Sequence, residues 1–368
     1  MKAHNIMEDI VAKYLDEMLA MRFDICTCET CREDIFAYVL TRVPARYVTT
    51  DSGAMHTMVE QVRVEQSSVI LKEIVNGIRI IGENPRHEER QDREEAYGLL
   101  MKQIKADRGV DFSQYRDRVL KRRIALRMRA HNCKSYAEYL QVLVHKPEEY
   151  DQLFDVLTIN VSSFFRDKHV WDKLRQEILP AIIEAKKNQH GFKRIKIWSA
   201  GCSHGEEPYS LAILLYELLE KDNFSIKAEV YATDIDKECL RQATQGRYDA
   251  SVMKTVSPYY LKRFFLKVGD EYQVVPHVKE MVRVKELNLI HDPGIIGVDM
   301  VVCRNVFIYF NRSLQEHLIM KFYESLEDRG YFLMGNSENM LGEARHVFDS
   351  VDTLCRIYQK KPRPNVLS

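Results

Sequence analysis

Residues 195–215 read Ile-Lys-Ile-Trp-Ser-Ala-Gly-Cys-Ser-His-Gly-Glu-Glu-Pro-Tyr-Ser-Leu-Ala-Ile-Leu-Leu, and they predict the central unit of the fold. The first four residues are typical of a short buried strand, and Gly201 and Gly205 then bracket a tight loop whose backbone can approach a ligand closely. Pro208 stands in the first turn of the helix that the following apolar residues predict. A strand, a glycine loop and a helix open a nucleotide-binding α/β domain, although an ordinary strand-to-helix turn can also contain two glycines.

Two carboxylates, Glu206 and Glu207, stand on the rim of this loop. A loop that binds phosphate keeps carboxylates away, so the ligand is expected to be cationic or rich in hydroxyl groups. The segment Ala228-Glu-Val-Tyr-Ala-Thr-Asp234 is typical of a second strand, and an acidic residue at its end usually pairs with ribose hydroxyls. The pattern therefore favours a sulfonium nucleoside over NAD or a triphosphate.

Three segments together carry a family resemblance: 198–210 (Trp-Ser-Ala-Gly-Cys-Ser-His-Gly-Glu-Glu-Pro-Tyr-Ser), 233–236 (Thr-Asp-Ile-Asp) and 303–310 (Cys-Arg-Asn-Val-Phe-Ile-Tyr-Phe). They resemble the CheR family of S-adenosylmethionine-dependent methyltransferases, which act on chemoreceptor glutamates, and the resemblance extends over about residues 97–358. It implies a protein-glutamate O-methyltransferase in signal transduction. One departure is His204, where the family usually has Thr, and it affects the hydrogen bonding of the loop.

The resemblance also implies roles for individual residues. The segment 160–166 (Asn-Val-Ser-Ser-Phe-Phe-Arg) matches a family motif in which Thr stands at the place of Ser162. Arg166 and Tyr309 would orient the substrate carboxylate as catalytic residues. Strand 298–303 is expected to be buried and parallel, so residues just past it would lie where open α/β sheets bind ligands. The expected cofactor-binding residues are Asn160, Ser162, Arg166, Glu206, Glu207, Asp234, Asn288, Leu289, Arg304 and Asn305.

The whole-chain composition narrows the class of protein. Among 368 residues, Lys+Arg and Asp+Glu are both 54, so no overall field points to nucleic acid. No apolar run approaches the roughly 20 residues of a membrane span, and the start shows no signal-peptide pattern. The eight cysteines do not form a disulfide framework, which favours a reducing, cytoplasmic location.

The chain is expected to be multidomain. Residues 82–95 contain no hydrophobic side chain and predict a polar linker or exposed helical connector. They separate a small all-α domain at 1–81 from a small all-α domain at 96–160 and an α/β, Rossmann-like methyltransferase domain at 161–360. A small antiparallel β-subdomain is expected at about 251–285, with strands at 268–275 and 281–284 around a Gly-Asp turn.

The first domain contains the segment Cys26-Thr-Cys-Glu-Thr-Cys31. Its three thiols, Cys26, Cys28 and Cys31, could bind Zn²⁺ with a fourth ligand, or could pack as small hydrophobic groups. The domain resembles ComFB-like proteins, whose members are helical dimers with cysteine-bound zinc, some of them cyclic-dinucleotide receptors. A homodimer and a regulatory ligand are therefore expected. Phosphate and base contacts are expected from Arg42, Arg46 and Tyr47, unless this is a solvated loop with a packed tyrosine.

A basic helix is predicted within residues 111–130. Like charges four residues apart repel, so this helix should need an acidic partner. The resemblance implies that this partner is the Glu-rich cytoplasmic helices of a chemoreceptor, docked on Arg123, Arg127 and Arg129, rather than nucleic acid. A merely solvated face remains an alternative, as do a non-catalytic, cofactor-gated scaffold and a carboxyl methyltransferase with another acidic protein substrate. The cationic residues of this helix are Arg116, Arg118, Lys121, Arg122, Arg123, Arg127 and Arg129.

Overall fold

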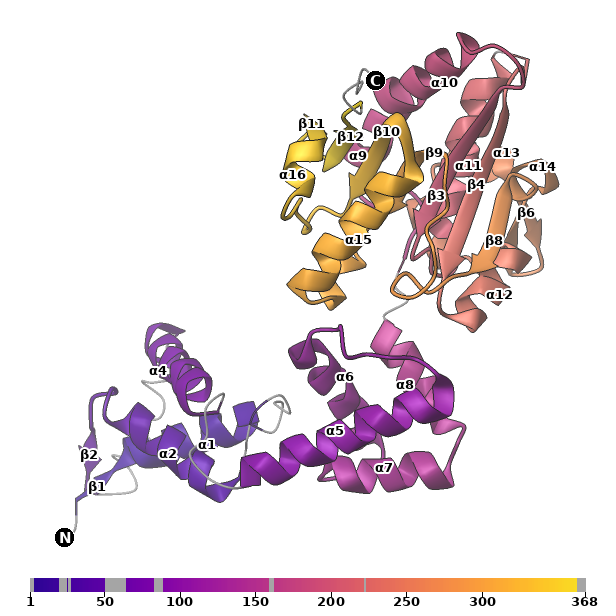
Figure 1. Ribbon diagram of the computed structural model, residues 1–368. Coiled ribbons are helices and arrows are strands. Elements are labelled where there is room, and N and C mark those ends of the chain that lie inside the picture. The colour runs from indigo at the N-terminus through magenta and orange to yellow at the C-terminus, as the bar shows by residue number, and fades with distance from the viewer. Residues whose placement is uncertain are drawn as a thin grey trace, which may run out of the picture. The chain divides into compact units, whose positions relative to one another are not determined.

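The structure is a computed structural model, and it describes residues 3–19, 25, 28–49, 64–82, 89–158, 162–221 and 223–362. The chain divides into two compact units, Met1–Leu157 and Thr158–Ser368. Figure 1 labels the helices and strands of both units.

The first part of the first unit is a small helical domain. Its described elements are β1 (His4–Asn5), α1 (Ile6–Leu19), α2 (Glu29–Leu40), β2 (Tyr47–Val48), α4 (Val64–Gly77) and η1 (Ile78–Gly82). One apolar face of each helix meets the others in a core that includes Val11, Ile35 and Ile74. The expectation of a purely helical domain needs one correction, because β1 pairs antiparallel with β2.

The second part of the first unit is a four-helix domain. Its elements are α5 (Glu89–Arg108), α6 (Asp117–Ala130), α7 (Tyr136–His145) and α8 (Glu149–Thr158), around a separate core that includes Leu100, Ile124 and Tyr139. Helix α5 begins inside the segment expected to be a polar linker or an exposed helical connector, and its first turns agree with the helical alternative. Glu, Arg and Gln are good helix formers even where the sequence has no apolar face. Glu94 is exposed there, and its carboxylate pairs with Lys121 at 2.6 Å.

The second unit is built on a seven-stranded sheet. It contains β3 (Arg194–Ala200), β4 (Lys227–Asp234), β8 (Val282–Glu286), β9 (Val298–Cys303), β10 (Leu326–Met334), β11 (Phe348–Asp352) and β12 (Ile357–Lys360). The order is β11-β12-β10-β9-β3-β4-β8, and Figure 1 shows it from the yellow strands on the left to orange β8 on the right. The five strands from β10 to β8 are parallel, and β12 is antiparallel to β10.

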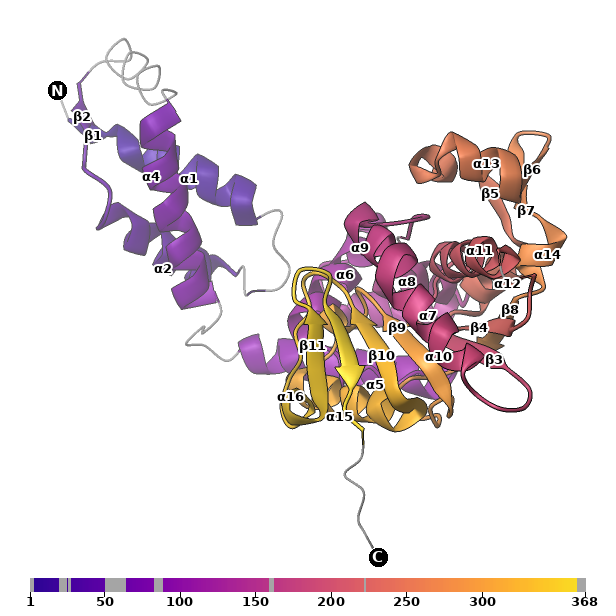
Figure 2. The ribbon, with the colours of Figure 1, turned by 90° about the horizontal axis from the view of Figure 1, so that it is seen from above.

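Helices cover both faces of this sheet, as Figure 2 shows. α15 (Arg312–Ser325) lies on one face, and α9 (Lys168–Lys173), η2 (Leu174–Ile178), α10 (Leu179–Lys187) and α11 (Glu206–Glu220) lie on the other. α12 (Lys237–Gln245) follows β4, η4 (Phe307–Tyr309) follows β9, and α16 (Ala344–Val347) precedes β11. A parallel sheet buried on both faces requires strands that are apolar along their length, and every residue of β9 is buried. The predicted α/β Rossmann-like architecture is confirmed.

A small antiparallel sheet is inserted between α12 and β8. It consists of β5 (Arg247–Asp249), β6 (Phe265–Val268) and β7 (Glu271–Val274), in the order β5-β7-β6, with η3 (Val252–Thr255), α13 (Pro258–Phe264) and α14 (Pro276–Lys279). The Gly-Asp turn and strand β7 lie where they were predicted, whereas β6, on the other side of the turn, was not predicted. The second expected strand, 281–284, was misplaced: Val282–Glu286 pairs parallel with β4 in the main sheet. Period-two alternation does not reveal which sheet a strand joins.

Candidate active site

The loop between β3 and α11 is held against the end of β4. The amides of Gly201 and Cys202 donate to the Thr233 carbonyl at 2.8 and 2.9 Å. Gly205, with φ of 98°, is the N-cap of α11, and a Cβ there would lie 2.9 Å from the Tyr248 hydroxyl. Glycine is required at this position by both the backbone conformation and the space. The loop is therefore fixed where β3 and β4 end.

Asp234 ends β4 and closes this loop. Its carboxylate accepts from the amides of Ser203, Ile235 and Asp236 at 2.9, 2.8 and 3.1 Å. Burial raises the pKa of Asp234, and the three amide donors oppose that effect. The strand end predicted for Asp234 is confirmed, and its carboxylate fixes the loop through these three amides.

Glu206 is the first residue of α11 and is only 3% exposed. Its Oε2 atom is buried and has no hydrogen-bond partner among the described residues. Burial raises the pKa of Glu206, while the Ser162 hydroxyl and the charge of His204 lower it. An unpaired buried carboxylate oxygen is costly unless a ligand supplies the missing donor. The donor that fits such a group best is a cation.

Glu207 and Arg304 are buried, and they contact each other and neighbouring residues. The Ser199 hydroxyl donates to Glu207 at 2.8 Å, and Arg304 Nη1 lies 3.5 Å from the same carboxylate. Arg304, whose side chain is 2% exposed, also donates to Asp167 at 2.6 Å and to the Arg166 carbonyl at 3.1 Å. These contacts connect segment 162–167 to α11. Glu207 and Arg304 therefore support the site through contacts with other residues of the chain.

The segment 162–167 carries unusual backbone conformations. Phe165 and Asp167 have φ of 53° and 63°, in the left-handed region that costs non-glycine residues energy. The Phe165 amide donates to the Ser210 hydroxyl at 3.1 Å, and Trp171 donates to the Arg166 carbonyl at 2.7 Å. These bonds hold the strained segment against α11. Burial raises the pKa of Glu207, and the charge of Arg304, followed by that of the exposed Arg166, opposes this effect.

A buried carboxylate that sequence reasoning missed fixes the turn after β9. Glu338 accepts from the amides of Phe307 at 2.9 Å and Gly335 at 2.7 Å. Burial raises its pKa, and amide donors that include Asn305 lower it. Asn305 itself has φ of 62°, and half-buried Tyr309 follows in η4. The signal in the sequence was Gly335-Asn-Ser-Glu338, a glutamate in the loop that follows the buried end of β10.

The turn after β8 lies beside Asp234. The Leu287 amide donates to the Asp234 carbonyl at 2.9 Å, and Asn288 and Leu289 follow. The Asn288 Oδ1 atom accepts from the Ile290 amide at 2.9 Å, so a contact with adenine would use its Nδ2 donor. The structure thus brings Ser162, Arg166, Glu206, Glu207, Asp234, Asn288, Leu289, Arg304, Asn305 and Tyr309 to the carboxyl ends of the strands and the adjoining segment. Asn160 lies outside the described residues.

His204, at the position where the family usually has threonine, makes contacts on both sides of the loop. Its Nδ1 atom lies 3.1 Å from the Ser203 hydroxyl and its Nε2 atom 3.4 Å from the Cys239 sulfur. Its carbonyl accepts from the Tyr248 hydroxyl at 2.8 Å. Burial raises the pKa of the Cys239 thiol, which favours its protonated form.

The basic helix α6 finds acidic partners inside its own domain. Arg127 donates twice to Glu149, at 2.7 and 2.6 Å, and His131 and Tyr139 each lie 2.8 Å from that carboxylate, which is 4% exposed. Arg123 donates to the Val156 carbonyl at 2.7 Å. Arg127 thus has an acidic partner within its own domain, and Arg123 has a carbonyl acceptor there. Receptor docking on Arg123, Arg127 and Arg129 stays a prediction. Arg129 is exposed.

The predicted residues of the first domain are scattered in their roles. Cys26 lies outside the described residues, Cys31 is buried, and Cys28 Sγ caps α2 by accepting from the Cys31 amide at 3.4 Å. No group of three possible metal ligands occurs among the described residues. The Arg42 guanidinium lies over the Tyr38 ring at 3.6 Å, whereas the Tyr47 side chain is 70% exposed. The Arg46 amide donates to Asn5 at 2.9 Å.

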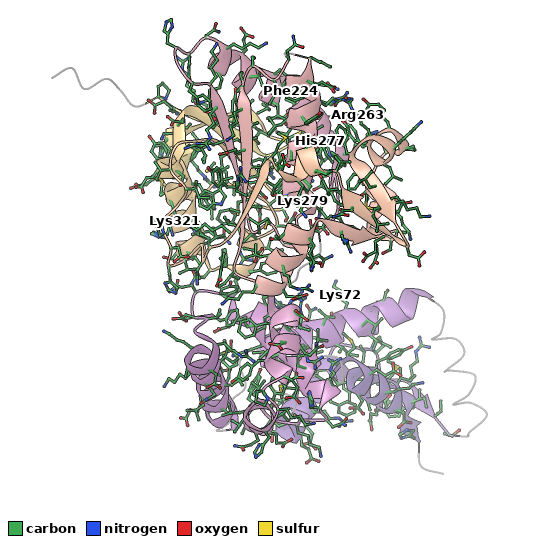
Figure 3. The ribbon with its side chains drawn as sticks, turned by 90° about the vertical axis from the view of Figure 1, so that its right-hand side faces the viewer. Lys72, Phe224, Arg263, His277, Lys279 and Lys321 are labelled. Carbon is green, nitrogen blue, oxygen red and sulfur yellow. The ribbon has the colours of Figure 1, made fainter. Side chains whose placement is uncertain are left out.

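A hollow of about 650 Å³ lies at the opposite edge of the main sheet. It is lined by the amino ends of β3 and β4, the end of α11 and α14, and includes Phe224 and His277, which Figure 3 labels. The ring of Tyr216 contacts both side chains, at 4.9 and 4.5 Å between centroids. Ligands of open α/β sheets bind at the carboxyl ends of the strands, so this hollow is not the candidate active site.

Comparisons with known proteins agree with this geometry. The family model for the CheR methyltransferase SAM-binding domain matches residues 160–356, the CheR all-alpha domain matches 95–158, and late competence development protein ComFB matches 4–85. A chemotaxis protein methyltransferase of Listeria monocytogenes is 32% identical over 253 residues, which are 69% of this chain and 93% of that protein. One from Borreliella burgdorferi is 33% identical over 249 residues, which are 66% of this chain and 87% of that protein.

The sheet order, the glycine loop and the carboxylates around it define an S-adenosylmethionine-dependent methyltransferase. The chain belongs to the CheR methyltransferase family, the protein-glutamate O-methyltransferases of chemotaxis. Residues 4–85 form a ComFB domain joined to it. Among the described helices, none is both long enough and apolar enough to cross a membrane.

Proposed function

We propose that this chain transfers the methyl group of S-adenosylmethionine to glutamate carboxylates on the cytoplasmic part of a chemoreceptor. The observation that carries the proposal is the buried Glu206 Oε2, which has no partner among the described residues and stands near Asp234 on the adjoining strand end. Glu206 would hold the ammonium group of the cofactor, and Asp234 its ribose hydroxyls. Asn288 and Leu289 would contact the adenine, and Ser162 and Asn305 would complete the cradle. Asn160 is proposed from its place in the sequence motif alone.

The bound cofactor supplies an activated methyl group on a sulfonium. The acceptor carboxylate is already ionised at neutral pH, so the chain need not provide a strong general base. Its task is to position the acceptor and exclude water, effects that contribute roughly 7–11 kcal/mol in favourable systems.

Electrostatics indicate which group admits the acceptor. Glu206, Glu207 and Asp234 would repel an approaching carboxylate, and Arg304 already partners Glu207. Arg166 is the exposed cation of segment 162–167 and would attract the acceptor, with Tyr309 orienting it.

The receptor surface proposed for α6 shifts to its exposed arginines. Arg118, Arg122 and Arg129 are exposed, and spacings of four and seven residues place them on one face of the helix. Leu126 is 48% exposed beside them. An acidic amphipathic helix would match this face, with charge attraction around one apolar contact. Arg123 and Arg127 would support the face from inside the domain.

Regulation through the ComFB domain is a further part of the proposal. A cyclic dinucleotide would bind near exposed Tyr47, with stacking from its ring and phosphate contacts from Arg46. Arg42, stacked on Tyr38, would have to leave that ring to take part. Zinc binding by Cys26, Cys28 and Cys31, with a ligand from a second copy, and dimerisation through this domain are proposed on the same basis.

The test is transfer of tritiated methyl from S-adenosylmethionine to a receptor cytoplasmic fragment, followed by release of labelled methanol in base. Incorporation that is labile to base supports a glutamate methyl ester. Cofactor binding without transfer to the receptor fragment or to other acidic proteins would favour a non-catalytic scaffold. Transfer to another acidic protein, but not to the receptor fragment, would retain the chemistry and refute the substrate.

A further inference from the structure

Lys321 on α15 makes contacts that the reaction chemistry does not require. Its ammonium donates to the carbonyls of Leu289 at 2.7 Å and Asp292 at 2.8 Å, and lies 3.5 Å from the Ile290 carbonyl. Figure 3 labels this side chain. The Lys321 ammonium thus supplies hydrogen-bond donors to carbonyls of a turn with which no described strand pairs. Bonds from an ammonium are stronger than those between neutral groups.

The same segment is packed directly on α15. A Cβ at Gly294 would lie 2.3 Å from the Ser325 hydroxyl oxygen and 3.4 Å from Lys321 Cγ, so only glycine permits this approach. Farther along, the Gly297 amide donates to the Ser325 carbonyl at 2.9 Å. Contacts at Leu289, Gly294 and Gly297 therefore fix the whole β8–β9 connection to one helix.

The turn that Lys321 holds begins at the ligand edge of the sheet. The Leu287 amide donates to the Asp234 carbonyl at 2.9 Å, and Asn288 follows at once. Within the turn, the Asn288 amide donates to Asp292 at 2.8 Å and the Asp292 amide donates to the Asn288 carbonyl at 2.9 Å. These bonds fix the turn internally, whereas Lys321 fixes it to the domain.

We infer that Lys321 is a positioning residue for the nucleoside end of the cofactor site, acting through the 288–292 turn. This inference rests on the proposed function for the identity of the ligand. Burial lowers the pKa of Lys321, as expected for an ammonium held under a loop. The Lys321 ammonium touches backbone carbonyls of the turn, so its effect on the cofactor passes through Asn288 and Leu289.

The test compares Lys321→Met, Lys321→Gln and Lys321→Arg in the full-length chain. Lys321→Met removes every donor, Lys321→Gln keeps a shorter one, and Lys321→Arg retains a charged donor fork. Glu324→Gln, exposed on the same helix, is the control. Hydrogen exchange of the Asn288–Asp292 amides is measured without ligand, and affinity for S-adenosylhomocysteine by calorimetry. KM for S-adenosylmethionine and kcat are then measured with the receptor fragment.

The expected result for Lys321→Met is faster exchange in the 288–292 turn and about a tenfold weaker cofactor affinity. KM for the cofactor rises while kcat at saturation changes little, and Lys321→Arg restores both properties. Unchanged exchange or unchanged affinity in Lys321→Met and Lys321→Gln would overturn the inference, as would a loss confined to kcat. Failure of the wild-type chain to bind S-adenosylhomocysteine would instead refute the proposed function, and the exchange data would still decide whether Lys321 holds the turn.

Discussion

Replacing Glu206 by Gln separates cofactor binding from folding. The substitution keeps the shape of the side chain but removes the charge expected to face the cofactor ammonium. A hydrogen bond to a charged group is worth about 1.5–3 kcal/mol, so the dissociation constant should rise roughly 10- to 150-fold. The buried Oε2 has no partner among the described residues, so this loss should not be accompanied by a loss of stability.

Without cofactor, Glu206→Gln is expected to leave the stability of the folded protein unchanged or to increase it. Burial raises the pKa of Glu206, which means that the folded state disfavours its charge and is destabilised by it at neutral pH. Glu206→Gln removes that charge, so the melting temperature without cofactor should stay the same or rise. For the wild type, cofactor affinity should fall with decreasing pH, beginning above the ordinary value of 4.5, as Glu206 takes up a proton.

Calorimetry with S-adenosylhomocysteine and thermal unfolding without ligand make the measurement, with exposed Glu324→Gln as the matched control. A Glu206→Gln protein that binds the cofactor as tightly as the wild type would refute the ammonium contact. A protein that melts well below the wild type without ligand would show that Glu206 is a structural partner, and the reasoning from its unpaired oxygen would be wrong.

Three further predictions concern the other domains. Reversing Arg122 and Arg129 to Glu should raise the KM for the receptor fragment steeply at low salt and leave cofactor affinity unchanged. A KM equal to that of the wild type would refute the proposed docking face on α6. Burial acts to raise the pKa of Glu149, but hydrogen bonds from Arg127, His131 and Tyr139 together lower it to about 2. These bonds therefore stabilise the folded domain above pH 4.5, and the stabilisation is lost as the pH falls from 4.5 to 2. Glu149→Gln should accordingly unfold the helical domain more easily, by about 3 kcal/mol at pH 7, with a difference that shrinks in acid, and chemical denaturation at pH 7 and 3 checks this. Methyl-transfer rates of the full chain and of residues 89–368 should respond differently to cyclic di-GMP or cyclic di-AMP, and identical responses would leave the ComFB domain a tethering role.

Local patterns were sufficient for the central unit of the enzyme. A buried strand, a glycine with positive φ and an apolar helix are properties of neighbouring residues, so 195–215 predicted β3, the loop and α11. The end of β4 placed Asp234 for the same reason, since parallel strands present their carboxyl ends at one edge. These features depend on backbone conformation and burial, which short stretches of sequence report directly.

Only the tertiary structure decided what each charged side chain does. Arg304 and Asp167 are 137 residues apart, and their ion pair makes Arg304 a support for the site. Glu338 and Lys321 hold turns through backbone amides and carbonyls, which no side-chain pattern in the sequence reports. The sequence of Val282–Glu286 fits a strand in either sheet, and only its pairing with β4 places it in the main sheet. From the sequence, Arg127 resembles an exposed surface cation, but in the structure it donates to Glu149 of another helix. The physical reason is the same in each case. A hydrogen bond or ion pair depends on the distance between two groups in space, and groups far apart in the sequence come together only when the core has formed.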